Sequence, residues 1–422
     1  VLFRSRFNGG RTIEDSMPLL KILEEAGVDA FDVDAGAYES MDYIFPPHYL
    51  GEACMAYVCK EARKHVNVPI LNSGNHSPET ALELLNSGDC DFVMFGRQAI
   101  ADPYFPKKLM ENRREDIRPC ILCNEECIGR IFDRLTQLSC AVNPSAGFED
   151  YMEIEETYEP KNIVVIGAGP AGLEAARTAA LKGHNVTVYE KHDFIGGIVK
   201  MVATAPFKKR LRELIDWYDV QLKKLGVKVV LGTEVKADDP MLKAADHIII
   251  ATGSEPIMPA IKGIDNANVV DVVEAHHKGI SGKDVVICGG GLSGCDAALE
   301  LAMKGKKVTV VEMLDECARD AMPINRISLM RMLAENNVTL MTNSKVVEIT
   351  SRGVMVEKQG GVREEIPADT VIIAFGQTNK NDFVDEVVAK YYMKTTVVGD
   401  AEKVGKVGNA IRTGFYAAMA IE

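Results

Sequence analysis

The chain has 422 residues, of which 48 are Lys or Arg and 61 are Asp or Glu, and its formal net charge is −13. This length exceeds what one hydrophobic core usually serves, so we expect two or three domains. The acidic balance, without any basic stripe that could follow phosphates, argues against a nucleic-acid partner. No apolar stretch reaches the roughly 18 residues of a membrane span, and the first residues lack the layout of a signal peptide. We therefore expect a cytoplasmic protein without a membrane partner.

Residues 1–118 alternate short apolar runs with helical stretches, a pattern typical of parallel βα units. Helices are predicted to begin at Ser16, with Pro18 just inside, and at Ser77, which Pro78 and Glu79 follow. The predicted strands are Val1–Phe7, Asp29–Val33, Pro69–Asn72 and Phe92–Phe95.

About four such units cannot close an eight-stranded barrel. The chain also opens inside a predicted strand, without an initiator methionine. We therefore expect an α/β protein that begins with the C-terminal half of a TIM barrel, as a fragment of a longer chain. No functional role is assigned to Arg4 and Arg6, because they lie at the very start of the chain.

Four of the ten cysteines fall in residues 119–148 with the spacing C-x2-C-x3-C-x12-C, namely Cys120, Cys123, Cys127 and Cys140. In a reducing compartment, such a cluster predicts a metal site instead of disulfides. The spacing suits a 4Fe–4S cluster. The alternative is a structural zinc site, which more often shows two C-x2-C pairs. The six scattered cysteines are predicted to be small buried side chains: Cys54, Cys59, Cys90, Cys288, Cys295 and Cys317.

An acidic linker, Glu149 to Glu159, leads to a Gly-rich strand–turn–helix unit with Gly167, Gly169 and Gly172. These glycines permit a tight turn, close approach to a pyrophosphate and close packing of helix on strand. The next strand ends in Glu190, an acid suited to ribose hydroxyls. Residues 162–190 are therefore predicted to bind a dinucleotide.

A second unit repeats this pattern in residues 284–312, and in both units 23 residues separate the first glycine from the acid. The acid at the strand end favours a free ribose 2′-hydroxyl, so NADH is preferred over NADPH. The matching residues of the second unit are Gly289, Gly291, Gly294 and Glu312.

Two such units resemble the two-dinucleotide flavoprotein disulfide reductases, with three further motifs in agreement. These are Gly196–Gly197, Ala251–Thr252–Gly253 and Gly399–Asp400. The resemblance implies a Rossmann-like FAD domain in residues 160–264 and 376–422, and an inserted NAD(H) domain in residues 265–375. It assigns FAD to the first unit together with Gly197, Thr252, Gly253 and Asp400, and NADH to the second unit. No redox cysteine pair stands near Phe194–Lys200, so electrons are expected to leave by another route.

The order of barrel, cysteine segment and FAD/NAD module resembles the multidomain old yellow enzyme family, which includes 2,4-dienoyl-CoA reductase, 2-enoate reductase and trimethylamine dehydrogenase. Two loops carry the barrel part of the likeness, Leu71–Gly74 and Phe95–Arg97, the latter followed by Asp102–Pro103. The resemblance implies that FMN phosphate is held by Ser73, Gly74, Gly96 and Arg97.

This resemblance implies an ene-reductase that passes electrons from NADH through FAD, the cluster and FMN to an activated alkene. The loops Asp34–Tyr38 and Phe45–His48 resemble those of enoate-reductase-like members, which favours an unsaturated acid, thioester or enone as the small-molecule substrate. Catalytic residues are expected in the missing half barrel, so none is assigned to His48, Tyr49 or His76. Two alternatives stay open: an amine dehydrogenase of the trimethylamine type, and an electron-transfer module for a protein partner. A homo-oligomer also stays open.

Overall fold

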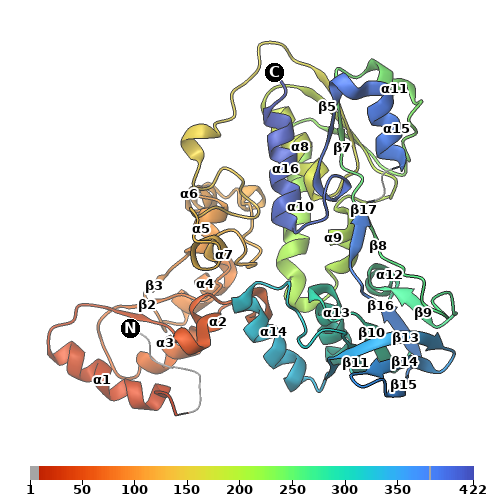
Figure 1. The fold of residues 1–422 in the computed structure, drawn as a ribbon. Coiled ribbons are helices and arrows are strands. Elements are labelled where there is room, and N and C mark those ends of the chain that lie inside the picture. Colours follow the sequence, from red (N-terminus) through yellow and green to blue (C-terminus); the bar gives the residue numbers. More distant parts are fainter. Residues whose placement is uncertain (1–8, 380–381) are drawn as a thin grey trace.

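The computed structural model describes residues 9–379 and 382–422. Figure 1 shows an N-terminal lobe beside two larger lobes, which contain the two Gly-rich units. The predicted strand Val1–Phe7, with Arg4 and Arg6, lies outside the described residues. No helix among the described residues combines the length and the apolar character that crossing a membrane requires.

The N-terminal lobe contains a parallel sheet in the order β1-β2-β3, which confirms three of the predicted strands with shorter bounds. Its core joins strand residues such as Phe31 and Ile70 to Leu20 and Val58 of the helices. The strands are β1 (Phe31–Val33), β2 (Ile70–Asn72) and β3 (Phe92–Val93). The helices are α1 (Ile13–Glu25), α2 (Met41–Ile44), α3 (Ala56–Ala62), α4 (Pro78–Asn86), α5 (Arg97–Ala101) and α6 (Phe105–Met110).

Helix beginnings in this lobe follow their capping side chains. The predicted start at Ser77 is confirmed, since the Thr80 amide donates to the Ser77 hydroxyl over 3.2 Å. The predicted start at Ser16 is wrong, and α1 begins at Ile13. The reason is a reciprocal cap, in which the Asp15 amide donates to Thr12 Oγ1 and the Thr12 amide donates to Asp15 Oδ2. The cap satisfies two free amides one turn earlier and leaves Pro18 inside the helix.

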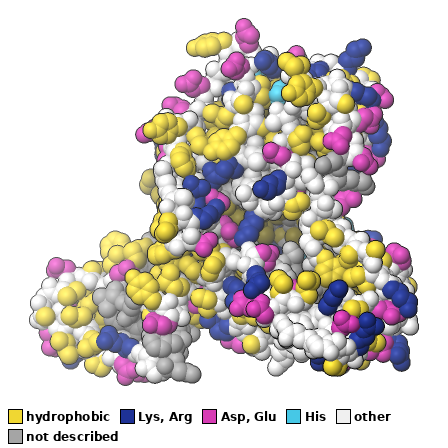
Figure 2. All heavy atoms as spheres, viewed as in Figure 1, with side chains coloured by type: hydrophobic (Ala, Val, Ile, Leu, Met, Phe, Trp, Pro, Cys, Tyr) yellow, Lys and Arg dark blue, Asp and Glu magenta, His cyan; other side chains and the backbone are white. Residues whose placement is uncertain are grey.

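Apolar side chains remain uncovered on the N-terminal lobe. Figure 2 shows hydrophobic side chains gathered over its surface. Ile22, Leu82 and Phe92 are 60%, 58% and 58% exposed, respectively. Among the described residues, β1 and β3 are edge strands of an open sheet. An apolar surface of this kind is suited to packing against further structure.

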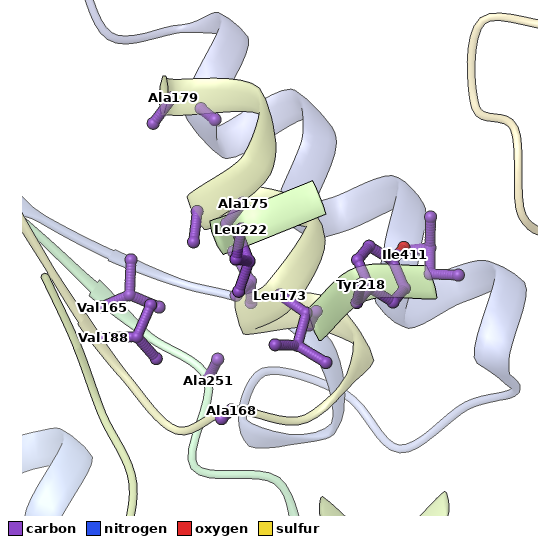
Figure 3. Packing of buried hydrophobic residues seen from close by; sticks show 14 of the residues in the cluster. Val165, Ala168, Leu173, Ala175, Ala179, Val188, Tyr218, Leu222, Ala251 and Ile411 are labelled. Carbon is purple, nitrogen blue, oxygen red and sulfur yellow. The ribbon is translucent and has the colours of Figure 1, made fainter. Parts of the chain in front are cut away.

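The first Gly-rich unit lies in a five-stranded parallel sheet of order β18-β7-β4-β5-β6. One face is covered by α8, α10 and α16, whose packing around Leu173 and Tyr218 is seen in Figure 3. The other face packs on α11 and α15 through Leu242, Val384 and Val387. The strands are β4 (Asn162–Ile166), β5 (Asn185–Tyr189), β6 (Lys228–Val230), β7 (His247–Ile250) and β18 (Thr395–Val397). The helices are α8 (Pro170–Leu181), α9 (Gly197–Val202), α10 (Lys209–Lys224), α11 (Pro240–Ala244), α15 (Asp382–Tyr391) and α16 (Val407–Met419).

The second Gly-rich unit lies in a separate parallel sheet of order β12-β11-β10-β16-β9, packed on an antiparallel sheet β13-β14-β15. Its strands are β9 (Val269–Asp271), β10 (Asp284–Cys288), β11 (Lys307–Val311), β12 (Thr339–Met341), β13 (Ser344–Thr350), β14 (Gly353–Lys358), β15 (Arg363–Pro367) and β16 (Thr370–Ile373). Its helices are α12 (Val272–Lys278), α13 (Leu292–Met303) and α14 (Pro323–Glu335).

The two nucleotide lobes are joined by an antiparallel pair, β8 (Ser254–Pro256) and β17 (Gln377–Asn379). The chain leaves one lobe through β8 and returns through β17. We therefore propose the domain limits 160–264 with 376–422 and 265–375, which this strand order supports.

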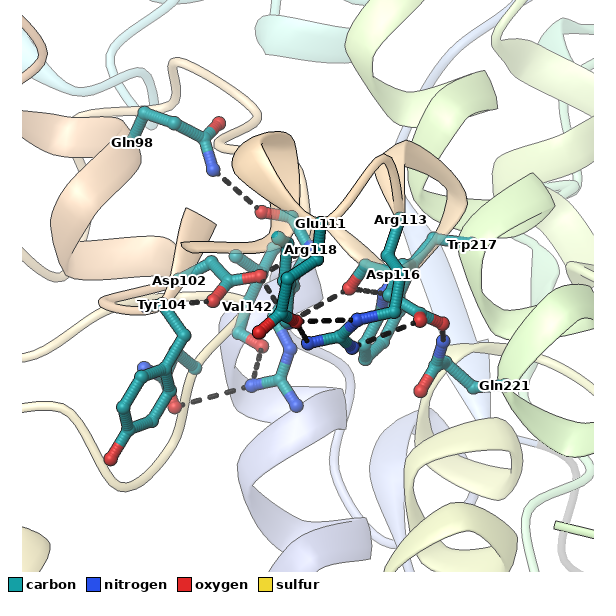
Figure 4. A network of polar contacts seen from close by, with 12 residues as sticks. Gln98, Asp102, Tyr104, Glu111, Arg113, Asp116, Arg118, Val142, Trp217 and Gln221 are labelled. Carbon is teal, nitrogen blue, oxygen red and sulfur yellow. Dashed lines mark hydrogen bonds and ion pairs between the residues drawn. The ribbon is translucent and has the colours of Figure 1, made fainter. Parts of the chain in front are cut away.

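The cysteine segment, with α7 (Ile128–Phe132), follows the N-terminal lobe, and a polar network ties their junction to α10 (Figure 4). Trp217 Nε1 donates to the carbonyl of Asp116 and Gln221 Nε2 to its carboxylate, each over 3.0 Å. The Arg118 guanidinium lies 4.6 Å from the centre of the Trp217 ring and donates to the Val142 carbonyl. The segment before Cys120 is thus fixed against the first nucleotide lobe.

The second nucleotide lobe is anchored to both other lobes through polar pairs with buried acids. The Tyr49 hydroxyl of the N-terminal lobe donates to Asp296 Oδ1 over 2.5 Å, and Lys208 Nζ of the first nucleotide lobe lies 3.2 Å from Asp296 Oδ2. Arg331 also pairs with the fully buried Asp42 of the N-terminal lobe over 2.7 Å. Since breaking such a pair leaves an uncompensated charge buried, these contacts hold the lobes in one arrangement.

Candidate functional site

The first Gly-rich loop has the shape that a dinucleotide requires. Gly167 has φ +101°, and a Cβ there would lie 2.3 Å from the Ala251 carbonyl oxygen. A Cβ on Gly172 would lie 2.0 Å from the Gly167 carbonyl oxygen, so helix and loop approach so closely that only glycine fits at this position. A Cβ on Gly169 would meet nothing within 4 Å. The loop therefore leaves open space in front of the α8 N-terminus, where a pyrophosphate can accept from backbone amides.

Glu190 closes this loop from the end of β5. Its carboxylate is buried and accepts from the Ala168 amide over 2.8 Å and from the His192 amide over 2.9 Å. His192 Nδ1 lies 2.7 Å from the same carboxylate. His192 was not among the predicted site residues, and its place two residues after the acid is the signal that could have found it.

The other residues predicted to bind FAD lie around the same loop. A Cβ on Gly197 would lie 3.1 Å from Gly169 Cα, so the two glycine loops touch. Thr252 and Gly253 follow β7, the neighbour of β4. Asp400 accepts from the Ser254 hydroxyl and from the Gly405 amide, each over 3.0 Å, just before α16. The fold thus gathers these residues at the carboxyl ends of adjacent parallel strands.

The second unit repeats the first in atomic detail. A Cβ on Gly289 would lie 2.3 Å from the Ala374 carbonyl oxygen, and one on Gly294 would lie 2.1 Å from the Gly289 carbonyl oxygen. Glu312 accepts from the Gly290 amide over 2.7 Å and from the Leu314 amide over 2.8 Å. The two units therefore share the glycine turn and the acid that closes it.

One difference between the units is an acid in front of the second loop. Asp320 Oδ1 accepts from the Leu292 amide over 2.8 Å, and a Cβ on Gly291 would lie 3.6 Å from the same oxygen. A carboxylate here satisfies an amide at the N-terminus of α13 that a pyrophosphate would otherwise use. The sequence analysis missed Asp320, because it lies 28 residues beyond Leu292 and outside the motif.

The four clustered cysteines line one small cavity together with Arg97, Asn124 and four apolar residues. Leu122 and Asn124 have φ values of +55° and +57°, which turns the chain sharply between the first three cysteines. The loop is held from outside, since the Cys120 amide donates to Gln98 Oε1 and the Asn325 side chain donates to the Cys123 carbonyl, each over 3.0 Å.

Among the described residues, no three Cys, His, Asp or Glu side chains converge closely enough to hold one metal ion. The four thiols nevertheless line the same cavity. Their ligation of a 4Fe–4S cluster stays a prediction.

Burial makes these thiols poor free thiolates. It raises the pKa of Cys123 and Cys127, and it raises the pKa of Cys140 to about 12. For Cys127, the guanidinium of Arg97 opposes the effect of burial on the pKa. Bound iron would supply the positive charge that stabilises the thiolates. Five of the six scattered cysteines are buried, which confirms the prediction for these five, whereas Cys54 is half-buried.

The cysteine segment contacts the FAD-side lobe at α16. Lys406 Nζ pairs with Glu125 over 2.7 Å, and Arg412 donates to the Ser139 hydroxyl over 3.2 Å. A Cβ on Gly408 would lie 3.1 Å from Ala141 Cβ, so helix and segment are in close contact. Asp400, one of the residues predicted to bind FAD, lies in the turn before α16.

The residues predicted to hold FMN phosphate lie in two adjacent loops. Ser73 and Gly74 follow β2, and Gly96 and Arg97 follow β3, its parallel neighbour. The two loops touch, because Arg97 Nη2 donates to Asn75 Oδ1 over 2.6 Å. A Cβ on Gly96 would meet nothing within 4 Å, which leaves its backbone open to a ligand. The FMN assignment of these residues stays a prediction.

The histidines and the tyrosine of these loops have structural partners. His76 Nε2 lies 3.0 Å from Asn72 Oδ1, and Tyr49 bonds to Asp296 as described above. The His48 ring is tilted by 41° against the Tyr49 ring, with 4.0 Å between ring centres.

Asp34, directly after β1, is an unusual acid of this lobe. Its Oδ1 is buried and has no hydrogen-bond partner among the described residues, and burial, aided by Asp32, raises its pKa to about 6. Because the folded pKa lies above the ordinary value of 3.8, ionisation of Asp34 favours unfolding. Its contribution to stability is full below pH 3.8 and is lost as the pH rises through about 6. We expect Asp34→Asn to remove part of the fall in thermal stability between pH 4 and pH 7. Equal pH profiles of the variant and the parent protein would contradict this.

Two family models match the chain in succession. Residues 4–116 match the NADH:flavin oxidoreductase / NADH oxidase family. Residues 161–401, more than half of the chain, match the pyridine nucleotide-disulphide oxidoreductase family. The matches indicate binding of FMN by the first part and of FAD and NAD by the second.

Individual relatives span both matches. The chain is 39% identical to an NADH oxidase of Thermoanaerobacter brockii, over 98% of this chain and 64% of the relative. It is 34% identical to a cinnamate reductase of Clostridium sporogenes, over 98% of this chain and 62% of the relative. The chain therefore spans less than two thirds of the length of these relatives.

A solved structure gives the same result. A 2-naphthoyl-CoA reductase in complex with 2-naphthoyl-CoA matches 99% of this chain and 64% of its own, with a TM-score of 0.92 and 33% identity. The match runs through the N-terminal lobe, the cysteine segment and both nucleotide lobes. The chain belongs to the pyridine nucleotide-disulphide oxidoreductase family through residues 161–401 and, by the NADH:flavin oxidoreductase part that precedes them, to the multidomain old yellow enzyme-like branch of 2-enoate reductases.

Proposed function

We propose that the full-length protein is an NADH-dependent ene-reductase that reduces the C=C bond of an activated alkene. When bound, FAD, a 4Fe–4S cluster and FMN supply the chain of redox groups between NADH and the alkene. The observation that carries this proposal is the place of the cysteine cavity. It lies between α16 of the FAD-side lobe and the Arg97 loop of the N-terminal lobe.

The two nucleotide lobes would divide the dinucleotides between them. Gly167, Gly169, Gly172, Glu190, Gly197, Thr252, Gly253 and Asp400 would hold FAD. Gly289, Gly291, Gly294 and Glu312 would hold NADH. The buried pairs of Asp296 and Asp42 keep the NADH lobe against the rest of the molecule. Glu312 favours NADH over NADPH, because its carboxylate would repel a 2′-phosphate.

The remaining groups would lie in the first 148 residues. Cys120, Cys123, Cys127 and Cys140 would ligate the cluster. Ser73, Gly74, Gly96 and Arg97 would hold the FMN phosphate. The exposed apolar side chains of the N-terminal lobe suit packing against further βα units, as a closed barrel would provide. A cytoplasmic location suits cysteines that must stay reduced until iron binds.

The relatives suggest the substrate class. The names cinnamate reductase and 2-naphthoyl-CoA reductase describe unsaturated rings or chains conjugated to a carboxylate or a thioester. We infer that this protein takes a small molecule in which a carbonyl group activates the C=C bond. An amine dehydrogenase would not need an intact second unit, whereas the second unit here repeats the first down to its Glu312 hydrogen bonds.

The test uses anaerobically purified full-length protein. About four irons and four sulfides per chain are expected, with rapid bleaching of flavin absorbance by NADH. Oxidation of NADH should depend on an unsaturated carbonyl compound, with cinnamate as the first probe and its CoA thioester as the second. An amine dehydrogenase would instead oxidise trimethylamine without NADH. In an electron-transfer module, NADH would bleach the flavin absorbance, but neither alkene would be reduced. Stoichiometric zinc without visible absorption would contradict the 4Fe–4S cluster.

A further inference from the structure

Arg97 lies at the wall of the cysteine cavity as well as in the loop predicted to hold FMN phosphate. Its guanidinium donates to Asn124 Oδ1 over 2.6 Å and to Asn75 Oδ1 over 2.6 Å. It also donates to the Pro46 carbonyl over 2.8 Å. The side chain thus bridges the N-terminal lobe and the cysteine loop.

All these partners of Arg97 are neutral oxygens. Among residues 9–379 and 382–422, no ion pair is formed by its guanidinium, unlike Arg113 or Arg331. A half-buried cation without a carboxylate partner is stabilised further by a nearby anion of another kind. A cluster bound by four thiolates carries net negative charge and would lie in the cavity that Arg97 lines.

Asn124 fixes the position of the Arg97 guanidinium. It stands between Cys123 and Cys127, is 1% exposed and has φ +57°. Its side-chain amide donates to the Phe45 carbonyl over 2.9 Å and to Asn325 Oδ1 over 2.8 Å, while its oxygen accepts from Arg97. With its side chain bonded on both ends, Asn124 cannot turn away without leaving buried polar groups unpaired.

We propose that Arg97, held by Asn75 and Asn124, raises the reduction potential of the cluster bound by the four cysteines. This inference rests on the proposed function, because it requires the cluster. One-electron reduction adds a negative charge to the cluster, and a cation nearby favours the reduced form. Arg97 would then serve two anions at once, the FMN phosphate and the cluster, and would make the cluster a better acceptor for electrons from the FAD side.

The test is a potentiometric titration of the full-length protein with dithionite, in which electron paramagnetic resonance follows the reduced cluster. Arg97→Gln should lower the ratio of reduced to oxidised cluster at a fixed potential by on the order of tenfold. Arg97→Lys keeps the charge and should retain most of the parent ratio. Arg113→Gln is the matched control, since Arg113 is exposed and paired with Glu111, and it should change nothing.

FMN loss could accompany Arg97→Gln, so the parent protein is also titrated after removal of FMN. If the parent protein keeps its ratio of reduced to oxidised cluster after FMN removal, the fall in Arg97→Gln is due to Arg97 itself. If FMN removal alone causes the same tenfold fall, the effect is due to FMN and the inference is overturned. If Arg97→Gln does not assemble a cluster, the same titration is made with Asn124→Ala. This variant keeps the arginine but removes the side chain that accepts its hydrogen bond. An unchanged ratio in the assembled variant would overturn the inference. A parent protein without any cluster would instead contradict the proposed function.

Discussion

Replacing Cys123 by alanine in the full-length protein is expected to abolish NADH-driven alkene reduction while leaving NADH-driven bleaching of FAD nearly intact. Bleaching of FAD by NADH needs only the two Gly-rich units, which lie in two sheets outside the cysteine segment. Cys123 lines the shared cavity, and its loop is tied to Asn325. Because even outer partners of a metal site are worth about 10- to 100-fold in affinity or activity, loss of a ligand should cost more than about 100-fold. Stopped-flow absorbance can follow the two flavins separately.

Dithionite should restore part of the alkene reduction in Cys123→Ala, provided that FMN is retained. The matched control is Cys90→Ala, which removes a buried cysteine of the N-terminal core far outside the cavity. This control should keep its iron and its activity. Undiminished alkene reduction with NADH by Cys123→Ala would show that the cysteine segment is structural and that electrons take another path.

The residues that could be predicted from sequence are those whose geometry depends on a few neighbours. Gly172 must be glycine because of the Gly167 carbonyl five residues earlier, and Glu190 meets its loop through one parallel strand pair. The second unit repeats both relations through Gly294 and Glu312. Such contacts recur wherever the motif recurs, so spacing alone was sufficient.

The contacts between lobes could not be predicted in this way. Tyr49 and Asp296 are 247 residues apart, and Asn124 and Asn325 are 201 residues apart. Neither pair belongs to a motif, because each depends on how separately folded lobes dock. The bridging role of Arg97 was missed for the same reason. The motif pointed to a phosphate, whereas its contact with Asn124 exists only once the cysteine loop folds onto the barrel loops.

Replacing Gly294 by valine is expected to remove NADH binding while FAD and iron stay at parent levels. The first added atom, Cβ, would lie 2.1 Å from the Gly289 carbonyl oxygen, so α13 would have to move away from its strand. Overpacking of this kind typically costs about 1–3 kcal/mol, which corresponds to a loss of about 5- to 150-fold in NADH affinity if the strain falls on the loop. Quenching of NADH fluorescence measures the affinity, and release of flavin by acid measures FAD.

The repeat supplies a matched control for this experiment. In Gly172→Val the added Cβ would lie 2.0 Å from the Gly167 carbonyl oxygen, the same clash in the other unit. This variant should lose FAD and keep the NADH lobe folded, as thermal unfolding followed by circular dichroism can show. If the two variants lose the same nucleotide, or if Gly294→Val loses FAD first, then the assignment of FAD to residues 162–190 and of NADH to residues 284–312 is reversed or wrong. Opposite losses in the two variants would establish the assignment, because the two substitutions differ only in the sheet that they disturb.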